Sequence, residues 1–337
     1  MPGWNLKNGE ITEYDVTEER YWELFNYVFS ESCAKRNTYK FGLIKSLLDN
    51  LFNMSCTDSG ICVNYTDLFG KFTENYWNLV VKYDLRQMRR DNRSERSKIE
   101  TILIAAVDAE EILANLEFES LDFHTKAEIV SKVTRECKRY VIGALYNDFD
   151  GILYAFDLSS DGLNINPTAY DFMLKYKAEL ERLNYYSWAK FLETVNTDDV
   201  LVRVIEKLEL STPRRSNLSV YREILRKEFE EDNCFYCGRK LKSSVHVDHF
   251  IPWSFTKDDK IWNFVLTCPS CNTKKNNCIP AHEYLIKIEQ RNARLEQINN
   301  EIVMEDFSMY SKGLLPRMWK YAKLSGIKEF KSCITRE

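Results

Sequence analysis

Four cysteines in two closely spaced pairs provide the clearest chemistry in this sequence. Cys234 and Cys237 form one Cys-x-x-Cys pair, and Cys268 and Cys271 form a second, with thirty residues between the inner thiols. Two such pairs at this separation are the usual signature of a tetrahedral zinc site, because each short knuckle directs two thiolates toward one ion. Four thiolates leave no coordination position open. We therefore expect this zinc ion to be structural.

The segment between the two pairs contains elements that would position further polar residues. Residues 245–251 alternate in character and are rich in β-branched and aromatic side chains, which predicts a short strand. A polar stretch over 252–259 and an apolar run over 262–266 predict a turn and a returning strand. A helix is expected to open behind the second cysteine pair, at Asn272. The predicted order is strand, loop, strand and helix, a ββα unit held at its base by zinc.

This part of the chain resembles the HNH nucleases, specifically the branch that carries two zinc knuckles. Besides the four thiols, the resemblance depends on the adjacent pair Asp248 and His249, on Asn263 fourteen residues after His249, and on Asn272 nine residues after Asn263. Lys275 stands where a basic residue often follows in the family. The resemblance covers about fifty of the 337 residues. It is specific, because all of these residues must fall into place together.

The resemblance implies a hydrolytic metal site. His249 would be the general base that takes a proton from water, a role that suits imidazole because it exchanges protons near neutral pH. Asp248 and Asn272 would bind a catalytic divalent cation, and Asn263 would tie the loop so that His249 points at the phosphate. Oxygen ligands completed by water suit Mg²⁺ or Mn²⁺ better than Zn²⁺. The ion would polarise the scissile phosphate of a DNA substrate.

The wider role follows only by analogy with the family. Its members commonly act in prokaryotic restriction and in defence against phage, so a restriction or anti-phage effector is expected. One ββα unit would cut one strand, and double-strand cutting would then need a homodimer or a partner protein. Two other interpretations stay open: a zinc ribbon that binds nucleic acid or protein without catalysis, and a nuclease that acts on RNA. His246 could touch the metal site, but a structural role is expected for it.

Composition sets limits for the whole chain. Hydrophobic residues make up 44% of it, with 11 glycines and 7 prolines, which is typical of an ordered, helix-rich protein of one or two domains. Ten cysteines, six of them scattered, suit a reducing compartment better than a disulfide framework. The sequence shows neither a signal-peptide core nor an apolar stretch long enough to span a membrane. We therefore expect a cytoplasmic protein without a membrane partner.

The predicted fold is mainly α with a small β component, in two parts. Residues 1–210 predict a helical domain with a targeting, regulatory or partner-binding role, and a small hairpin is expected near 141–156. Residues 211–217 have the composition of a linker. Residues 218–337 are predicted to form the HNH module with carboxy-terminal helices, in which 284–303 is expected to be one amphipathic helix.

Basic residues form two groups that are candidates for contact with nucleic acid. The formal net charge of −4 gives no overall nucleic-acid signature, but it does not exclude a local basic face. Residues 82–98 contain seven basic and three acidic side chains, and residues 234–282 contain the same numbers. The candidates are Arg86, Arg89, Arg90, Arg93, Lys274 and Lys275. For the first group, a solvated helix face or loop is the ordinary alternative.

If the arginines of 82–98 grip phosphates, replacing Arg89, Arg90 and Arg93 together with Glu is expected to weaken DNA binding. Contacts to phosphate contribute salt-dependent, sequence-independent affinity. The slope of log affinity against log salt should then fall by about one for each phosphate that is no longer bound. Fluorescence anisotropy over a salt series measures both quantities. Unchanged binding at low salt would remove this hypothesis.

Overall fold

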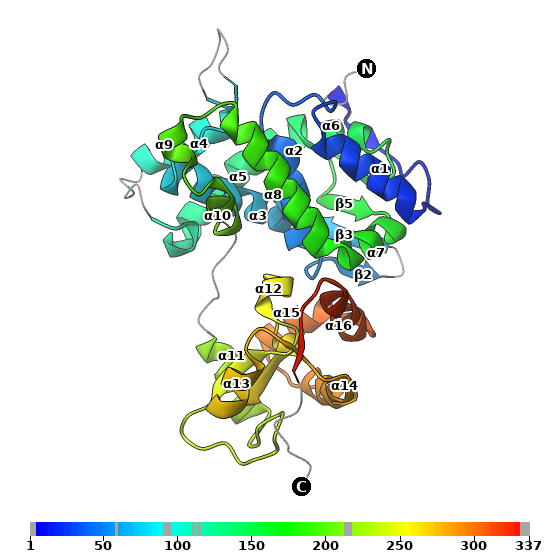
Figure 1. Ribbon diagram of the computed structural model, residues 1–337, viewed down its shortest axis with the longest axis vertical. Coiled ribbons are helices and arrows are strands. Elements are labelled where there is room, and N and C mark those ends of the chain that lie inside the picture. Colours follow the sequence, from blue (N-terminus) through cyan, green and yellow to red (C-terminus); the bar gives the residue numbers. More distant parts are fainter. Residues whose placement is uncertain are drawn as a thin grey trace. The chain divides into compact units, whose positions relative to one another are not determined.

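The structure, a computed structural model, describes residues 5–57, 60–89, 96–109, 112, 116–211 and 218–330. It is 57% helix and 10% strand, which confirms the predicted mainly α fold with a small β component. The chain divides into two compact units, Met1–Arg214 and Arg215–Glu337 (Figure 1). Of the predicted linker, only Ser211 lies within the described residues. None of the described helices has both the length and the apolar character needed to cross a bilayer.

The amino-terminal unit consists of helices around one antiparallel sheet. Its helices are α1 (Glu18–Phe29), α2 (Tyr39–Asp49), α3 (Tyr65–Trp77), α4 (Lys98–Ala109), α5 (Phe123–Tyr140), α6 (Ile142–Asp148), α7 (Pro167–Lys175), α8 (Lys177–Glu193), α9 (Asp198–Leu201) and α10 (Val204–Glu209), with a π-helical turn at Asn78–Lys82 and a 3-10 turn at Phe118–Ser120. Several begin at a capping side chain that accepts a backbone N–H. At α7, for example, Asn166 accepts from the amide of Thr168, and Pro167 occupies the first turn.

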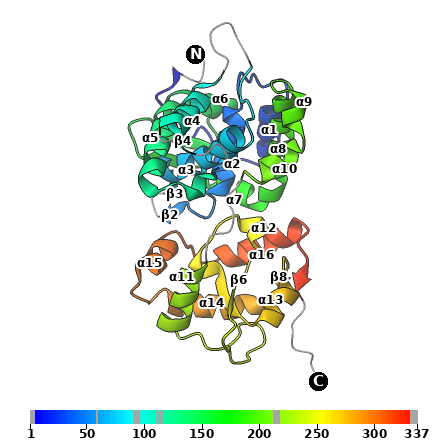
Figure 2. The same ribbon diagram turned by 90° about the vertical axis from the view of Figure 1, so that its left-hand side faces the viewer.

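Five short strands form the sheet of this unit. They are β1 (Asn8–Gly9), β2 (Ser55–Thr57), β3 (Gly60–Asn64), β4 (Tyr154–Asp157) and β5 (Gly162–Ile165), in the order β1-β4-β5-β3-β2. Figure 2 labels β2, β3 and β4 of this sheet. Tyr154 pairs with Ile165 in the β4–β5 hairpin. The hairpin predicted near 141–156 is therefore wrong in position, because 142–148 form α6. Ile142 and Leu145 are both fully buried at helical spacing, and such a short apolar run does not distinguish a strand from a buried helix.

Aromatic side chains fill the core between α2, α3 and α8. Trp188 of α8 lies 6.2 Å from the ring of Phe41 and 5.6 Å from that of Tyr76, measured between ring centroids. Tyr76 in turn stacks on Phe72 at 4.4 Å. These rings are almost completely buried. The amino-terminal unit thus has a hydrophobic core of its own.

The carboxy-terminal unit contains the predicted ββα arrangement. Its elements are α11 (Ser219–Glu223), a π-helical turn (Ile224–Glu228), β6 (His246–His249), α12 (Trp253–Thr256), a 3-10 turn (Ile261–Asn263), β7 (Phe264–Thr267), α13 (Pro269–Lys275), β8 (Ile279–Pro280), α14 (Glu283–Leu295), α15 (Glu301–Ser308), α16 (Leu314–Leu324) and β9 (Glu329–Phe330). Strands β6 and β7 pair antiparallel, from His246 opposite Thr267 to His249 opposite Phe264. Helix α13 follows β7 and packs against β6. It begins at Pro269, so Asn272 lies inside the helix and not at its start.

Helices α14 and α15 hold the returning strand in place. The single helix expected over 284–303 is two helices, and Asn300 caps the second by accepting from two backbone amides. On α14, Asn292 donates to the carbonyl of Trp262 at 2.8 Å. On α15, the carboxylate of Asp306 accepts a hydrogen bond from the backbone amide of Ile261 at 2.7 Å. The main-chain carbonyl of Asp306 accepts one from the indole N–H of Trp262 at 3.1 Å. The turn that enters β7 is therefore fixed by polar contacts from outside the ββα unit.

Candidate active site

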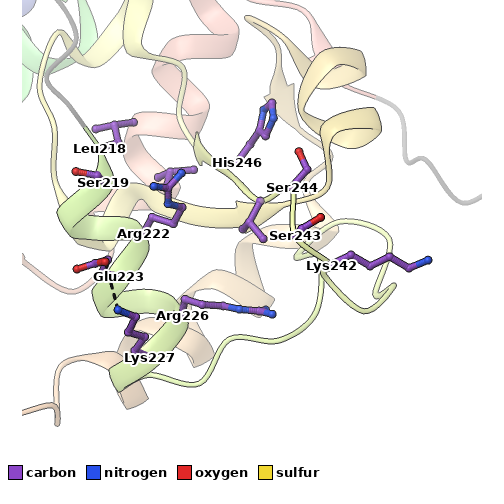
Figure 3. A pocket seen from close by; sticks show the side chains of 12 residues that line it. Leu218, Ser219, Arg222, Glu223, Arg226, Lys227, Lys242, Ser243, Ser244 and His246 are labelled. Atoms are coloured by element: carbon purple, nitrogen blue, oxygen red, sulfur yellow. Dashed lines mark hydrogen bonds and ion pairs between the residues drawn. The ribbon is translucent and has the colours of Figure 1, made fainter.

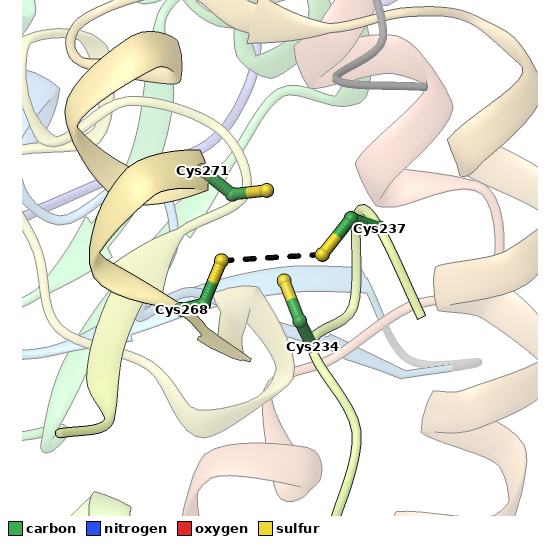
Figure 4. A group of neighbouring side chains, drawn as sticks. All are labelled: Cys234, Cys237, Cys268 and Cys271. Atoms are coloured by element: carbon green, nitrogen blue, oxygen red, sulfur yellow. Dashed lines mark hydrogen bonds between the residues drawn. The ribbon is translucent and has the colours of Figure 1, made fainter. Parts of the chain in front are cut away.

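The four predicted zinc ligands converge on one point (Figure 4). Their Sγ atoms all lie within 4.8 Å of one another, and those of Cys237 and Cys268 are 3.9 Å apart. Tetrahedral zinc with Zn–S distances of about 2.3 Å places sulfurs about 3.8 Å apart. Gly238, at φ +70°, closes the first knuckle and donates its amide to the carbonyl of Cys234 at 2.9 Å. The donor set and its spacing therefore fit a four-thiolate Zn²⁺.

Asp248 lies buried on β6 between two donors. The hydroxyl of Tyr236 donates to its Oδ2 at 2.7 Å, and the ammonium of Lys275 lies 3.1 Å from the same oxygen. Burial raises the pKa of Tyr236 well above its ordinary value, and the charge of Asp248 adds to this effect. The phenol therefore stays protonated and keeps donating. Such outer partners orient a metal-binding carboxylate.

Lys275 belongs to this site and not to a basic surface. Its side chain is 1% exposed, and besides Asp248 it donates to the carbonyl of His249 at 2.7 Å. Lys275 also lines the cavity that contains Asp248 and His249. Its expected contact with the nucleic-acid backbone stays a prediction. Lys274 is exposed on α13, and its contact with nucleic acid remains a prediction.

His249 is paired with an acid that the sequence did not single out. Its Nε2 lies 2.7 Å from Oδ1 of Asp259. The edge of its ring meets Phe264, with ring centroids 4.7 Å apart. An ionised carboxylate can only accept, so Nε2 carries the proton and Nδ1 is the basic nitrogen of the neutral ring. The sequence feature that could have indicated this pairing is an acid ten residues after His249, in the polar stretch between the two strands.

Asn263 clamps the backbone that follows His249. Its Oδ1 accepts from the amide of Ile251 at 2.8 Å, and its Nδ2 donates to the carbonyl of Ile251 at 3.0 Å. Its own carbonyl accepts from the amide of Phe250 at 2.7 Å. The side chain is buried, and every one of these contacts is to main chain. Asn263 thus fixes the turn that leaves β6.

Asp248, His249 and Asn272 line one cavity of about 390 Å³. Because one water molecule takes about 30 Å³ of liquid volume, the cavity has room for a hydrated cation beside a phosphate group. Asn272 reaches it from the middle of α13, and its Nδ2 lies 3.1 Å from Nδ1 of His246. That contact leaves the amide oxygen of Asn272 as the atom for a cation. His246 therefore orients the second predicted ligand.

The predicted arginines lie in the amino-terminal unit. Arg90 and Arg93 fall outside the described residues. Arg86 is partly buried, whereas Arg89 is exposed and its guanidinium lies over the ring of Phe191 at 5.6 Å from the centroid. Arg89 also lines a cavity of about 1030 Å³ that has three other basic residues in its wall. Contact of these arginines with nucleic acid remains a prediction.

The antiparallel strand pair, the following helix and the thiol cluster define a ββα module with two Cys-x-x-Cys knuckles that could hold one zinc ion. Residues 234–281 match the family model described as HNH endonuclease. The resemblance to the HNH family is thereby confirmed for this segment of the carboxy-terminal part, whereas the amino-terminal region matches no family model. The comparisons with curated proteins and with solved structures gave no match.

Proposed function

We propose that this protein is a metal-dependent endonuclease that hydrolyses phosphodiester bonds in DNA. One observation carries the proposal: the cavity lined by Asp248, His249 and Asn272, inside the region that matches the HNH family. It combines a base with two oxygen ligands for a cation. A zinc ribbon that only binds would need the thiol cluster but not this second group of polar residues.

Asp248 and the amide oxygen of Asn272 are the groups that would hold the catalytic cation. One carboxylate and one amide oxygen, completed by water and a phosphate oxygen, suit Mg²⁺ or Mn²⁺. When bound, such an ion supplies charge stabilisation at the scissile phosphate and at the leaving 3′ oxygen. Tyr236 and Lys275 keep the carboxylate of Asp248 in one orientation.

His249 takes the proton from the attacking water at Nδ1. Asp259 holds the Nε2–H, and its negative charge favours the imidazolium that forms when the proton arrives. Asn263 holds the backbone just after His249 in place through its two hydrogen bonds to Ile251. Asp306 fixes the turn behind Asp259 through the amide of Ile261. The base is thus positioned by contacts from both sides of the loop.

Replacing Asp259 with Asn is expected to lower kcat about 10- to 100-fold, the usual effect of losing a partner that orients a reactive histidine. The KM should change little, because Asp259 is not among the residues that line the cavity. Asp258→Asn is the matched control. An equal loss of activity in both variants would reduce Asp259 to a structural role.

The biological role is proposed by analogy with the family. We propose a restriction or anti-phage effector in which the helical amino-terminal unit has a targeting, regulatory or partner-binding role. A single module cuts one strand, so double-strand cutting requires a homodimer or a partner protein. Nicked against linear plasmid products, together with size-exclusion chromatography and light scattering, test this point.

Supercoiled plasmid incubated with the purified protein and Mg²⁺ tests the proposed activity. Conversion to nicked circles is expected. Protein that stays inert with Mg²⁺ and with Mn²⁺ would favour a zinc module that only binds.

A further inference from the structure

A second hollow on the carboxy-terminal unit has a basic lining. Its volume is about 650 Å³, and its wall comes from α11, the π-helical turn after it and the segment that leads into β6. Figure 3 shows its side chains. Four of them are basic, namely Arg222, Arg226, Lys227 and Lys242, and one, Glu223, is acidic. We refer to this hollow as the basic groove.

Two of the four basic side chains form ion pairs with acidic residues, and the other two do not within the described residues. Arg226 is paired with Asp232 at 2.9 Å, and Lys227 with Glu223 at 3.3 Å. Arg222 and Lys242 are exposed. Within the part of the chain that the structure describes, neither has a carboxylate at ion-pair distance. Arg222 and Lys242 therefore bring uncompensated positive charge to the groove, Lys242 from its outer edge, where its side chain extends away from Arg222 (Figure 3). An anion is the class of ligand that such charges favour.

The basic groove adjoins the cavity of the candidate active site. The two hollows share Leu218 and Val247 in their walls. His246 also links them, because it lines the groove and its Nδ1 lies 3.1 Å from Nδ2 of Asn272, which lines the cavity. An extended ligand with one group in the cavity can therefore continue into the groove without leaving the surface.

We propose that the basic groove binds the phosphodiester backbone of the strand that is cut, next to the scissile phosphate, with Arg222 and Lys242 as the contacts. This inference rests on the proposed nuclease function and assigns part of the substrate to a place on the protein. One strand of a duplex carries a phosphate about every 3.4 Å along the helix axis. A strand with one phosphate beside Asp248 and His249 thus carries its neighbours past this groove. Such contacts set the register of the strand and do not read its sequence.

The test compares a double charge reversal in the groove with a matched reversal elsewhere on the same unit. Arg222→Glu/Lys242→Glu changes the groove, and Lys312→Glu/Lys320→Glu is the control, because these lysines are exposed and line neither hollow. Both pairs are placed in the full chain carrying His249→Ala, so that binding is measured without cleavage. The probes are a fluorescein-labelled 20-base-pair DNA duplex, its single strand, and the RNA duplex of the same sequence. Zinc content and circular dichroism check the fold.

Groove reversal is expected to weaken binding about tenfold or more near 0.1 M salt and to lower the salt slope by about two, one for each phosphate that the groove no longer binds. The control should change neither quantity. With the catalytic histidine restored, the groove variant should show a raised KM for plasmid with kcat largely kept, the pattern expected when uniform binding is removed. An equal effect on DNA and RNA probes supports a site for the shared backbone, and an effect on one probe alone identifies that nucleic acid as the ligand.

Two failures of this test have different meanings. If the wild-type chain nicks plasmid but groove and control variants bind alike, the groove assignment is wrong and the nuclease function stands. If the wild-type chain neither binds any probe nor nicks plasmid with Mg²⁺ or Mn²⁺, the groove assignment and the proposed function are both wrong.

Discussion

Replacing His249 with alanine is expected to abolish the nicking of supercoiled plasmid. A positioned general base typically contributes about 10²- to 10⁴-fold to the rate. A loss of this size would bring nicking by the variant down to the background of the assay. His249→Gln should lose as much, although glutamine fills more of the space beside Phe264. Nicked, linear and supercoiled forms are quantified on agarose gels over a time course with Mg²⁺.

The choice of control and of a second variant depends on which side chains are exposed and which are buried. His124→Ala removes an exposed histidine on α5 and should leave the rate unchanged. Asp248→Asn is a better second variant than Asp248→Ala. Both variants remove the charge that faces the ammonium of Lys275, but the amide of Asn keeps an acceptor oxygen for Lys275 and Tyr236, whereas alanine leaves both donors without an acceptor at this position. Breaking a buried ion pair outright costs about 3–5 kcal/mol. Nicking that persists in both His249 variants would show that another group activates the water.

Removing zinc is expected to unfold the carboxy-terminal unit. A four-thiolate zinc contributes about 10–16 kcal/mol to the folding of small zinc domains, and a domain has a net stability of only about 5–15 kcal/mol. The contribution of the ion is therefore as large as the whole free energy of unfolding, and the unit is expected to unfold without it. Strong chelation, or Cys234→Ser/Cys268→Ser, should release about one zinc per chain and expose the unit to limited proteolysis. Metal content is measured with a colorimetric chelator after denaturation.

Cys278 provides the matched control for the thiols. It lies seven residues after Cys271 but does not belong to the cluster of four. Cys278→Ser should keep both zinc and protease resistance. A double Cys→Ser variant that stays protease-resistant and active without zinc would show that α14–α16 hold the module without the ion.

The sequence by itself determined the parts that are encoded over short distances. The two Cys-x-x-Cys knuckles predicted the thiol cluster, since each fixes two ligands within one turn of chain. The alternating run at 245–251 and the apolar run at 262–266 predicted the strand pair for the same local reason. The family spacing likewise selected Asp248, His249 and Asn272 as candidates, and these three residues line one cavity.

Only the tertiary structure decided which charges meet. His249 is paired with Asp259, and Asp248 is paired with the buried Lys275. The motif selects His249 and Asp248 but not the charges that they meet, and it does not predict the basic groove beside them. The support of β7 by Asp306, from α15, and the true position of the β4–β5 hairpin are of the same kind. An aspartate or lysine has the same local sequence preference whether it is solvated or buried in a pair. Its partner is set by how distant segments pack, and no local pattern in the chain records that packing.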